Sequence, residues 1–205
     1  MASGQDLAIE KVAEADFPSR FGHFRIYGFE GRNGQATDEA VVLRMGKLSG
    51  EPAPLVRIHS QCLTGDVFHS LRCDCRTQLE LSLAMIADER RGLLIYEHKE
   101  GRGIGLLNKL RAYALQDEGA DTVQANEILG FEADLRDYSL PAEILRHFGV
   151  KKVRLISNNP EKIRALEQAG IEVVERIPCQ VPLTATAGEY LRTKKEKMGH
   201  LLEGF

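Results

Sequence analysis

Three cysteines, Cys62, Cys73 and Cys75, lie within fourteen residues of one another. A catalytic zinc ion is typically held by three protein ligands and keeps a fourth position open for water. In extended chain, Cys73 and Cys75 point to the same side because side chains alternate with a period of two, so both sulfurs can reach one ion. Cys62 can complete a three-thiolate site from the preceding loop. The cluster therefore predicts a metal-assisted hydrolase.

The residues around the cysteines suit an anionic, hydrogen-bonding substrate. Residues 57–60 (Arg-Ile-His-Ser) precede the cluster, and Arg72, Arg76 and Gln78 lie within or just after it. We therefore expect a phosphorylated substrate. Three thiolates leave a dication with net negative charge and acidify its water less than three histidines would, so a neighbouring base must assist.

A structural zinc ion is the alternative reading of the same cysteines. Structural sites close their coordination with a fourth protein ligand. That ligand would come from Cys179, His59, His69 or an aspartate. The usual structural pattern has two cysteine pairs with two to four residues inside each, which this chain lacks, so the catalytic interpretation is favoured.

Three further segments could bind phosphate or act on it. Residues 100–105 (Glu-Gly-Arg-Gly-Ile-Gly) lie between an expected strand and a helix, where backbone N–H groups can receive an anion. Residues 158–162 open another helix in the same way, although a simple helix cap explains them equally well. Residues 134–137 bring a carboxylate and a guanidinium together, a pattern that is usually a surface ion pair.

Composition limits the possible partners. The 205 residues carry 27 basic and 30 acidic side chains, a net charge of −3, which excludes broad affinity for nucleic acids or membranes. We expect no secretory signal, because the first ten residues lack an apolar region, and no apolar run is long enough to span a bilayer. The clustered cysteines favour reduced thiolates on a metal, and hence a cytoplasmic protein, over disulfides.

Hydrophobic periodicity predicts an α/β protein: one domain with a mixed β-sheet flanked by helices and a β-rich N-terminal part. Residues 1–10 are expected to be a flexible N-terminus, and residues 11–205 the domain. A turn at residues 31–34 would separate the first strands, and Leu106, Leu110, Tyr113 and Ala114 would form one helical stripe. Strands are expected at 21–27, 39–45, 56–59, 92–96, 153–157 and 171–174, and helices at 77–90, 104–118, 140–148, 160–168 and 187–202.

Taken together, the motifs closely resemble GTP cyclohydrolase II. The resemblance rests on residues 57–66, 71–75, 100–106 and 110–116, and continues through 130–137, 158–160 and 197–201. It covers nearly the whole chain from about residue 11, in the family's order, and so identifies 11–205 as a GTP cyclohydrolase II-like domain. The dihydroxybutanone phosphate synthase domain often fused ahead of this one is missing, which implies a monofunctional enzyme.

The resemblance implies a reaction and its cofactors. GTP would lose C8 of its guanine ring as formate and would lose pyrophosphate, in the first step of riboflavin biosynthesis. One zinc ion per subunit would sit on Cys62, Cys73 and Cys75 and present the attacking water. Magnesium would neutralise the triphosphate. A homodimer is also implied.

The resemblance further assigns individual residues. Arg136 would be the nucleophile toward the α-phosphate, with Asp134 as proton acceptor, and a milder version makes Arg136 an electrostatic clamp. Tyr113 would serve hydrolysis of the formamide to the amine. The substrate-binding residues would be Arg57, Ile58, His59, Ser60, Gln61, Gln78, Glu100, Gly101, Arg102, Thr122, Ser157 and Lys162.

Two positions depart from the family pattern. Gln61 stands where the family usually has glutamate, and an amide cannot supply the same charge beside a zinc ligand. Ser157 replaces a threonine and keeps the hydroxyl. These departures leave two alternatives open: a paralogue that releases mainly the formamide intermediate, and a zinc-stabilised GTP-binding protein without turnover.

Overall fold

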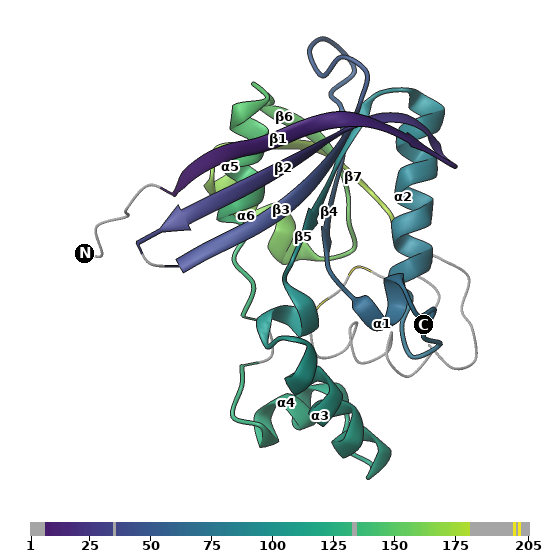
Figure 1. Ribbon diagram of the computed structural model, residues 1–205, viewed down its shortest axis with the longest axis vertical. Coiled ribbons are helices and arrows are strands. Elements are labelled where there is room, and N and C mark those ends of the chain that lie inside the picture. Colours follow the sequence, from purple (N-terminus) through teal and green to yellow (C-terminus); the bar gives the residue numbers. More distant parts are fainter. Residues whose placement is uncertain (1–6, 35, 133–134, 181–198, 200, 202–205) are drawn as a thin grey trace.

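The computed structural model describes residues 7–34, 36–132, 135–180, 199 and 201. Seven strands of this described part form one sheet in the order β1-β2-β3-β5-β4-β6-β7 (Figure 1). The strands are β1 (Ala8–Ser19), β2 (Gly22–Asn33), β3 (Ala36–Met45), β4 (Leu55–Ser60), β5 (Gly92–Glu97), β6 (Lys152–Ile156) and β7 (Glu172–Ile177). Neighbours from β1 to β5 pair antiparallel, whereas β5, β4, β6 and β7 run parallel. The mixed sheet and the β-rich N-terminal part are thus confirmed.

The first strand was not expected from the sequence. β1 begins at Ala8, inside the range 1–10 that was predicted to be a flexible terminus, and it pairs only with β2. Most of its side chains are exposed, because it lies at the edge of the sheet. An edge strand of this kind lacks the apolar alternation that marks a strand with one buried face.

The turn predicted at residues 31–34 is wrong in position. Gly31 lies inside β2, where it pairs with Ile9 on one side and with Asp38 on the other. A Cβ atom at Gly31 would lie 2.9 Å from Cδ1 of Leu140, so this glycine permits close helix packing rather than a turn. The chain reverses after Asn33, and Gly34 has a φ of +62°, which glycine adopts readily.

Helices cover both faces of the parallel half of the sheet. They are α1 (Leu63–Asp66), α2 (Cys75–Glu89), α3 (Leu106–Asp117), α4 (Thr122–Ile128), α5 (Ser139–His147) and α6 (Pro160–Gln168), with a 3-10 turn η1 at Glu100–Gly103. Figure 1 shows α2 on one side of the sheet, α5 and α6 on the other, and α3 with α4 beyond its end. None of the helices in the described part combines the length and the apolar character that a membrane span requires.

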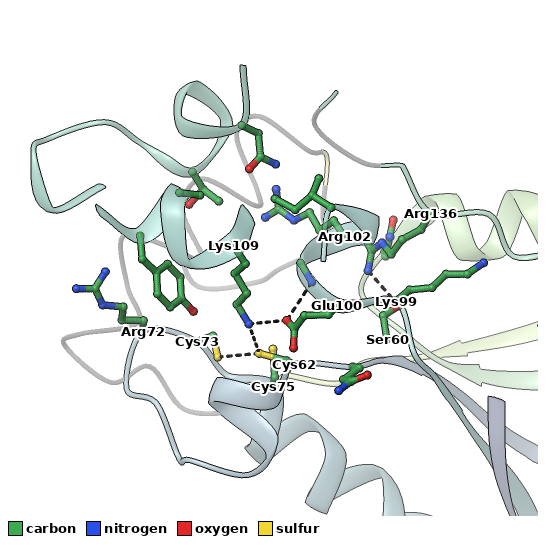
Figure 2. A pocket seen from close by; sticks show the side chains of 18 of the residues that line it. Ser60, Cys62, Arg72, Cys73, Cys75, Lys99, Glu100, Arg102, Lys109 and Arg136 are labelled. Carbon is green, nitrogen blue, oxygen red and sulfur yellow. Dashed lines mark hydrogen bonds and ion pairs between the residues drawn. The ribbon is translucent and has the colours of Figure 1, made fainter. Parts of the chain in front are cut away.

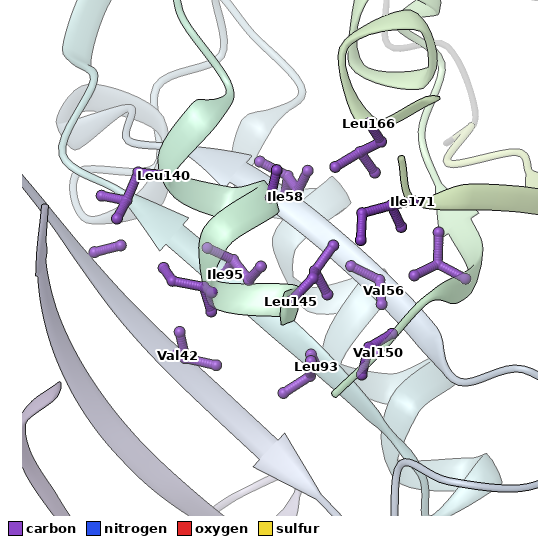
Figure 3. Packing of buried hydrophobic residues seen from close by; sticks show 14 of the residues in the cluster. Val42, Val56, Ile58, Leu93, Ile95, Leu140, Leu145, Val150, Leu166 and Ile171 are labelled. Carbon is purple, nitrogen blue, oxygen red and sulfur yellow. The ribbon is translucent and has the colours of Figure 1, made fainter. Parts of the chain in front are cut away.

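Alternating side chains of the central strands build two cores. Ile58 and Ile95 belong to the core beneath α5 and α6, together with Leu145 and Leu166 (Figure 3). Leu55 and Leu94 belong to the second core, against Leu83 and Ile86 of α2. Because both faces of β4 and β5 are buried, these strands are fixed rigidly, and the residues at their ends hold defined positions.

Two helices have features that the sequence did not predict. The stripe on the helix predicted at 104–118 does not face a core, because Leu110 is 44% exposed and Ala114 is exposed, whereas Ala112 is buried. This helix, α3, packs on α4 and η1 instead of on the sheet. α5 begins at Ser139, one residue before its predicted start, and the backbone N–H of Ser139 donates to the Asp137 carboxylate at 2.8 Å.

The unit β6-α6-β7 matches its prediction closely. The side chain of Asn159 accepts a hydrogen bond from the backbone N–H of Glu161 at 2.9 Å, and Pro160 occupies the first turn. This is the arrangement that proline at the first helical position favours. β6 and β7 then pair parallel, as the short strand–helix–strand spacing predicts. The helix expected at 187–202 lies outside the described residues apart from 199 and 201.

Candidate active site

The thiol groups of Cys62, Cys73 and Cys75 come together beyond the end of β4 (Figure 2). Their sulfurs all lie within 4.8 Å of one another, and the Cys62 and Cys73 sulfurs are 3.7 Å apart. A tetrahedral zinc ion with Zn–S bonds of about 2.3 Å would hold two sulfurs about 3.8 Å apart. The donor type and the spacing both fit zinc.

Gly65 allows the three thiols to approach. A Cβ atom at this position would lie 2.7 Å from the Cys73 sulfur, 3.1 Å from the Cys62 sulfur and 3.1 Å from Cβ of Cys75. Any larger residue would therefore push into the cluster. α1 carries Gly65 and follows Cys62 directly, so the turn after β4 both supplies one thiol and leaves room for the other two.

None of the suggested fourth ligands joins the three thiols in the described residues. The Cys179 sulfur is fully buried elsewhere, 3.6 Å from the Ser82 hydroxyl. His59 turns its Nε2 to the Asp66 carboxylate at 3.2 Å, and His69 is exposed. All four cysteines are free thiols, as the sequence predicts for a reduced protein. An ion on the three sulfurs would therefore keep a position for water or substrate.

Lys109 of α3 lies directly against this cluster. Its ammonium nitrogen is 3.1 Å from the Cys62 sulfur, 2.9 Å from the Thr64 hydroxyl and 2.7 Å from Oε1 of Glu100 (Figure 2). Burial opposes the charge on Lys109, but the Cys62 sulfur and Glu100 outweigh it and raise its pKa. The sequence analysis did not select Lys109, although it precedes Tyr113 by one helical turn and so shares its face.

Hydrogen bonds among the thiols concentrate negative charge on one sulfur. The pKa of Cys62 is lowered because the Cys73 and Cys75 thiols donate to its sulfur, and the Lys109 ammonium adds to this effect. The same bond raises the pKa of Cys73 to about 11. The pKa of Cys75 is raised as well, for the same reason and because Cys75 is buried. The cluster thus presents a thiolate where a metal would bind.

A buried carboxylate, Asp66, holds the backbone next to the thiol cluster. It accepts hydrogen bonds from the backbone N–H of Cys62 at 3.0 Å and from the Tyr96 hydroxyl at 2.8 Å. His59 contacts the same carboxylate and stacks on the Tyr96 ring, and burial lowers the pKa of His59. These contacts fix the backbone at Cys62. His59 therefore acts through Asp66 as well as lining the pocket.

A pocket of about 490 Å³ opens at the thiol cluster. It brings together nearly all of the site residues that the resemblance assigns. The assigned residues that line it are Arg57, His59, Ser60, Gln61, Cys62, Cys73, Cys75, Gln78, Glu100, Gly101, Arg102, Tyr113, Thr122, Arg136, Ser157 and Lys162. The Ile58 side chain instead lies in the core, while its backbone carbonyl accepts a hydrogen bond from Lys162 at 2.7 Å. Asp134 lies outside the described residues.

Several cations line the pocket away from the thiols. The guanidinium of Arg57 donates to the Ile156 carbonyl at 3.1 Å and to the Gln78 side chain at 2.7 Å, which holds it in place. Arg136 donates to the Ser60 hydroxyl at 3.3 Å. Lys162, almost completely buried, lies on the same wall. Fixed, partly dehydrated cations of this kind suit a polyphosphate.

Glu100 connects the glycine-rich turn η1 to the segment that follows Cys62. Its Oε2 accepts the backbone N–H of Leu63 at 2.6 Å, and its Oε1 accepts the backbone N–H of Gly101 at 2.9 Å besides the Lys109 ammonium. Gly101 and Arg102 both have positive φ angles, 61° and 62°. That conformation is uncommon for arginine, so the surrounding contacts hold η1 in a defined shape.

A second buried carboxyl group, Glu97, lies among the cations. It ends β5 and is fully buried. Oε2 accepts from the Ser60 hydroxyl at 3.4 Å, whereas Oε1 has no hydrogen-bond partner within the described part of the chain and lies 3.6 Å from the Lys99 ammonium. Burial raises the pKa of Glu97, although Lys162, Lys99 and Arg136 act in the opposite direction. The sequence analysis missed this residue, because a single glutamate at a strand end carries no distinguishing pattern.

Tyr113 stands beside the thiol cluster on α3. Its hydroxyl is 3.2 Å from the Thr64 hydroxyl, and the Arg72 guanidinium lies 5.0 Å above its ring. Burial raises the pKa of Tyr113, so the phenol stays protonated at neutral pH. The hydroxyl is therefore placed to donate a hydrogen bond near a metal-bound group.

Comparisons with known proteins agree with this site. A model of the family described as "GTP cyclohydrolase II" matches residues 10–178. The chain is 53% identical over 194 residues to "GTP cyclohydrolase-2" of Histophilus somni (strain 2336), covering 95% of this chain and 89% of that protein. It is 52% identical over 196 residues to "GTP cyclohydrolase-2" of Escherichia coli O9:H4 (strain HS), covering 96% and 99% of the two chains.

A longer relative carries the same region within a larger protein. The chain is 50% identical over 194 residues to "Riboflavin biosynthesis protein RibBA" of Chlorobium phaeovibrioides (strain DSM 265 / 1930). The match covers 95% of this chain but spans only 47% of that protein. With the family match over residues 10–178 and the identities above 50% along most of its length, the chain belongs to the GTP cyclohydrolase II family.

Proposed function

We propose that this protein is a zinc-dependent hydrolase that converts GTP into 2,5-diamino-6-ribosylamino-4(3H)-pyrimidinone 5′-phosphate, formate and pyrophosphate. The proposal is carried by one observation: three thiols with the spacing of zinc ligands open into a cation-lined pocket of about 490 Å³. This reaction would be the first step of riboflavin biosynthesis, and membership of the GTP cyclohydrolase II family supports it.

Cys62, Cys73 and Cys75 would hold one zinc ion, which would activate a water molecule toward C8 of guanine and stabilise the oxyanions that form. The chain itself supplies the surroundings of that ion. Gly65 leaves room for the three sulfurs, and Asp66 holds the backbone of Cys62. Orienting contacts of this kind commonly change metal affinity or activity 10–100-fold when they are removed.

The cation-lined wall would take the triphosphate, with Mg²⁺ neutralising part of its charge. Arg57 and Lys162 are held by backbone carbonyls and need little reorganisation to receive it. Arg136 would act on the α-phosphate, as nucleophile with Asp134 as its proton acceptor, or as a clamp. A guanidinium stays protonated at neutral pH, so the clamp needs no deprotonation and is the simpler role.

Tyr113 would assist the second hydrolysis, in which the formamide gives formate and an amine. Its hydroxyl lies beside the thiol cluster, bonded to Thr64. A protonated phenol there can donate to the oxygen that develops charge or to the departing amine. Tyr113 therefore favours the complete reaction over release of the formamide.

The test is to incubate the zinc-loaded protein with GTP and Mg²⁺ and to identify all products by mass. Formate, pyrophosphate and the diaminopyrimidinone monophosphate support the proposal. Pyrophosphate with a product heavier by one CO unit would instead identify a formamide-releasing paralogue. Intact GTP would leave a zinc-stabilised binding protein.

The Cys73→Ser variant is the matched control, since it replaces one sulfur by oxygen with little change in size. We expect it to lose zinc and turnover together while it stays folded. A folded Cys73→Ser protein with one zinc per chain would contradict the ligand assignment.

The proposal also includes a homodimer and a cytoplasmic location. The free cysteines agree with reducing conditions, and sedimentation analysis tests the dimer.

A further inference from the structure

The ammonium group of Lys109 points toward the thiol cluster and Glu100 (Figure 2). The Lys109 side chain is 12% exposed, although the residue lines the pocket. A lysine carries three N–H donors. All three have an acceptor here: the Cys62 sulfur, the Thr64 hydroxyl and the Glu100 carboxylate. In this arrangement Lys109 keeps no donor for a phosphate.

The positive charge of Lys109 lies beside a cluster that would carry net negative charge with a metal bound. Three thiolates and one dication carry a net charge of −1, and the Lys109 ammonium supplies a positive charge directly at the Cys62 sulfur. An anionic metal centre acidifies its water weakly, because sulfur already donates much charge to the metal. An N–H donor at 3.1 Å from the Cys62 sulfur withdraws part of that charge.

Glu100 explains how the ammonium is kept in place. The carboxylate holds Lys109 through Oε1 and the backbone of Leu63, next to Cys62, through Oε2. The ammonium and the thiol that it contacts are therefore tied to the same acidic side chain. Since Glu100 also accepts the Gly101 N–H, the position of η1 is linked to the charge at the sulfur.

We propose that Lys109 is a positioning residue of the metal centre: its ammonium donates a hydrogen bond to the Cys62 thiolate, offsets the surplus negative charge and makes the bound metal a stronger Lewis acid. The inference rests on the proposed zinc site and deepens it. Lys109 acts through Cys62 and does not touch the substrate. A purely structural Lys109–Glu100 ion pair would leave the electronic state of the metal unchanged.

The decisive experiment loads the full chain with Co²⁺, which absorbs light through sulfur-to-metal charge transfer, and compares Lys109→Met with the unchanged protein. Removing the hydrogen bond raises the energy of the sulfur electrons, so we expect the charge-transfer band to move to longer wavelength at one Co²⁺ per chain. With zinc, we expect kcat for GTP to fall 10–100-fold. We expect KM to change less than threefold, because the phosphate-binding cations remain.

Three further variants separate this role from an effect on stability. Arg111→Met removes a positive charge from the exposed side of the same helix, where the Arg111 guanidinium donates to the Asn108 side chain, and should leave the band unchanged. The double variant Glu100→Gln/Lys109→Met leaves no buried carboxylate without its cation, and it should still show the shifted band. Lys109→Arg retains the charge and should recover part of kcat and part of the band position.

The proposal is overturned if folded Lys109→Met binds Co²⁺ with the original band position, or if Arg111→Met shifts the band equally. The optical readout needs no turnover. A shifted band in a protein that leaves GTP intact would therefore support the role of Lys109 and reject the proposed function. An unshifted band in a protein that forms the expected products would do the reverse.

Discussion

Replacing Gly65 by alanine is the smallest change that should disturb the thiol cluster. The added methyl carbon would lie 2.7 Å from the Cys73 sulfur, whereas ordinary contacts begin at 3.4 Å. The sulfur must therefore move by about 0.7 Å, or the helix α1 must shift with it. Zinc sites keep their ligand distances within about 0.2 Å of the ideal values. The displacement exceeds that tolerance more than threefold.

Opposing effects decide the size of the change in stability. Alanine is favoured over glycine inside a helix by up to about 1 kcal/mol. Forcing an extra methyl group into a packed site costs about 1–3 kcal/mol. The metal-free protein should therefore lose about 1 kcal/mol of stability. We expect a larger effect on metal binding, a 10–100-fold loss of zinc affinity, equivalent to about 1.4–2.7 kcal/mol.

The assay is competition for zinc against a coloured chelator, with thermal melts of the metal-free and zinc-loaded proteins measured by circular dichroism. Gly28→Ala is the matched control, because Gly28 of β2 has open space at its Cβ position and a φ outside the left-handed region. That variant should bind zinc normally. A Gly65→Ala protein that holds one zinc ion with unchanged affinity would refute the steric reasoning.

Three further predictions concern the pocket. Burial raises the pKa of Glu97 above its ordinary value of 4.5, so between these two pH values the native state holds a proton that the unfolded state releases. The free energy of unfolding therefore falls as pH rises from 4.5 to the raised pKa. Glu97→Gln lacks this loss, so its stability in urea relative to the unchanged protein should increase with pH across that window and then level off. Tyr113→Phe should accumulate the formamide product by mass spectrometry, and an unchanged yield of the diamine would exclude that role. Gln61→Glu should raise turnover if the missing carboxylate limits the reaction, and an unchanged kcat would mean that the position tolerates either group.

The strands and helices with a buried face could be predicted from the sequence, because burial imposes periodicity. β4, β5 and α6 follow their predicted limits within one or two residues. α3 was predicted to carry one stripe with Leu106, Leu110, Tyr113 and Ala114, yet Leu110 of that stripe is 44% exposed. Its apolar residues carry the same periodicity as those of a core helix, so the sequence alone could not show that α3 lies beyond the sheet.

The site residues also divide into those that the sequence could predict and those that only the fold reveals. The three cysteines could be found from their spacing, since two thiols one residue apart are unusual. Gly65 and Lys109 could not, because their importance comes from contacts that the fold creates. A Cβ at Gly65 would meet Cys73, eight residues away, and Lys109 meets Cys62 across 47 residues. Spacing identifies ligands that lie close in sequence, whereas steric room and compensating charge depend on tertiary structure.

The strand order explains why one pocket can serve two kinds of chemistry. β5, β4 and β6 are parallel neighbours, so their carboxyl ends meet at one edge of the sheet, where ligands of open α/β sheets bind. The central strand β4 continues directly into Cys62, and its neighbour β6 into Ser157, which lines the pocket. Cys62 therefore follows the strand that also carries Arg57, and Ser157 follows the neighbouring strand, about 5 Å away in the sheet. The proposed substrate, a nucleoside triphosphate, carries its ring and its phosphates at opposite ends, so it could contact the thiols and the cations of this one pocket together.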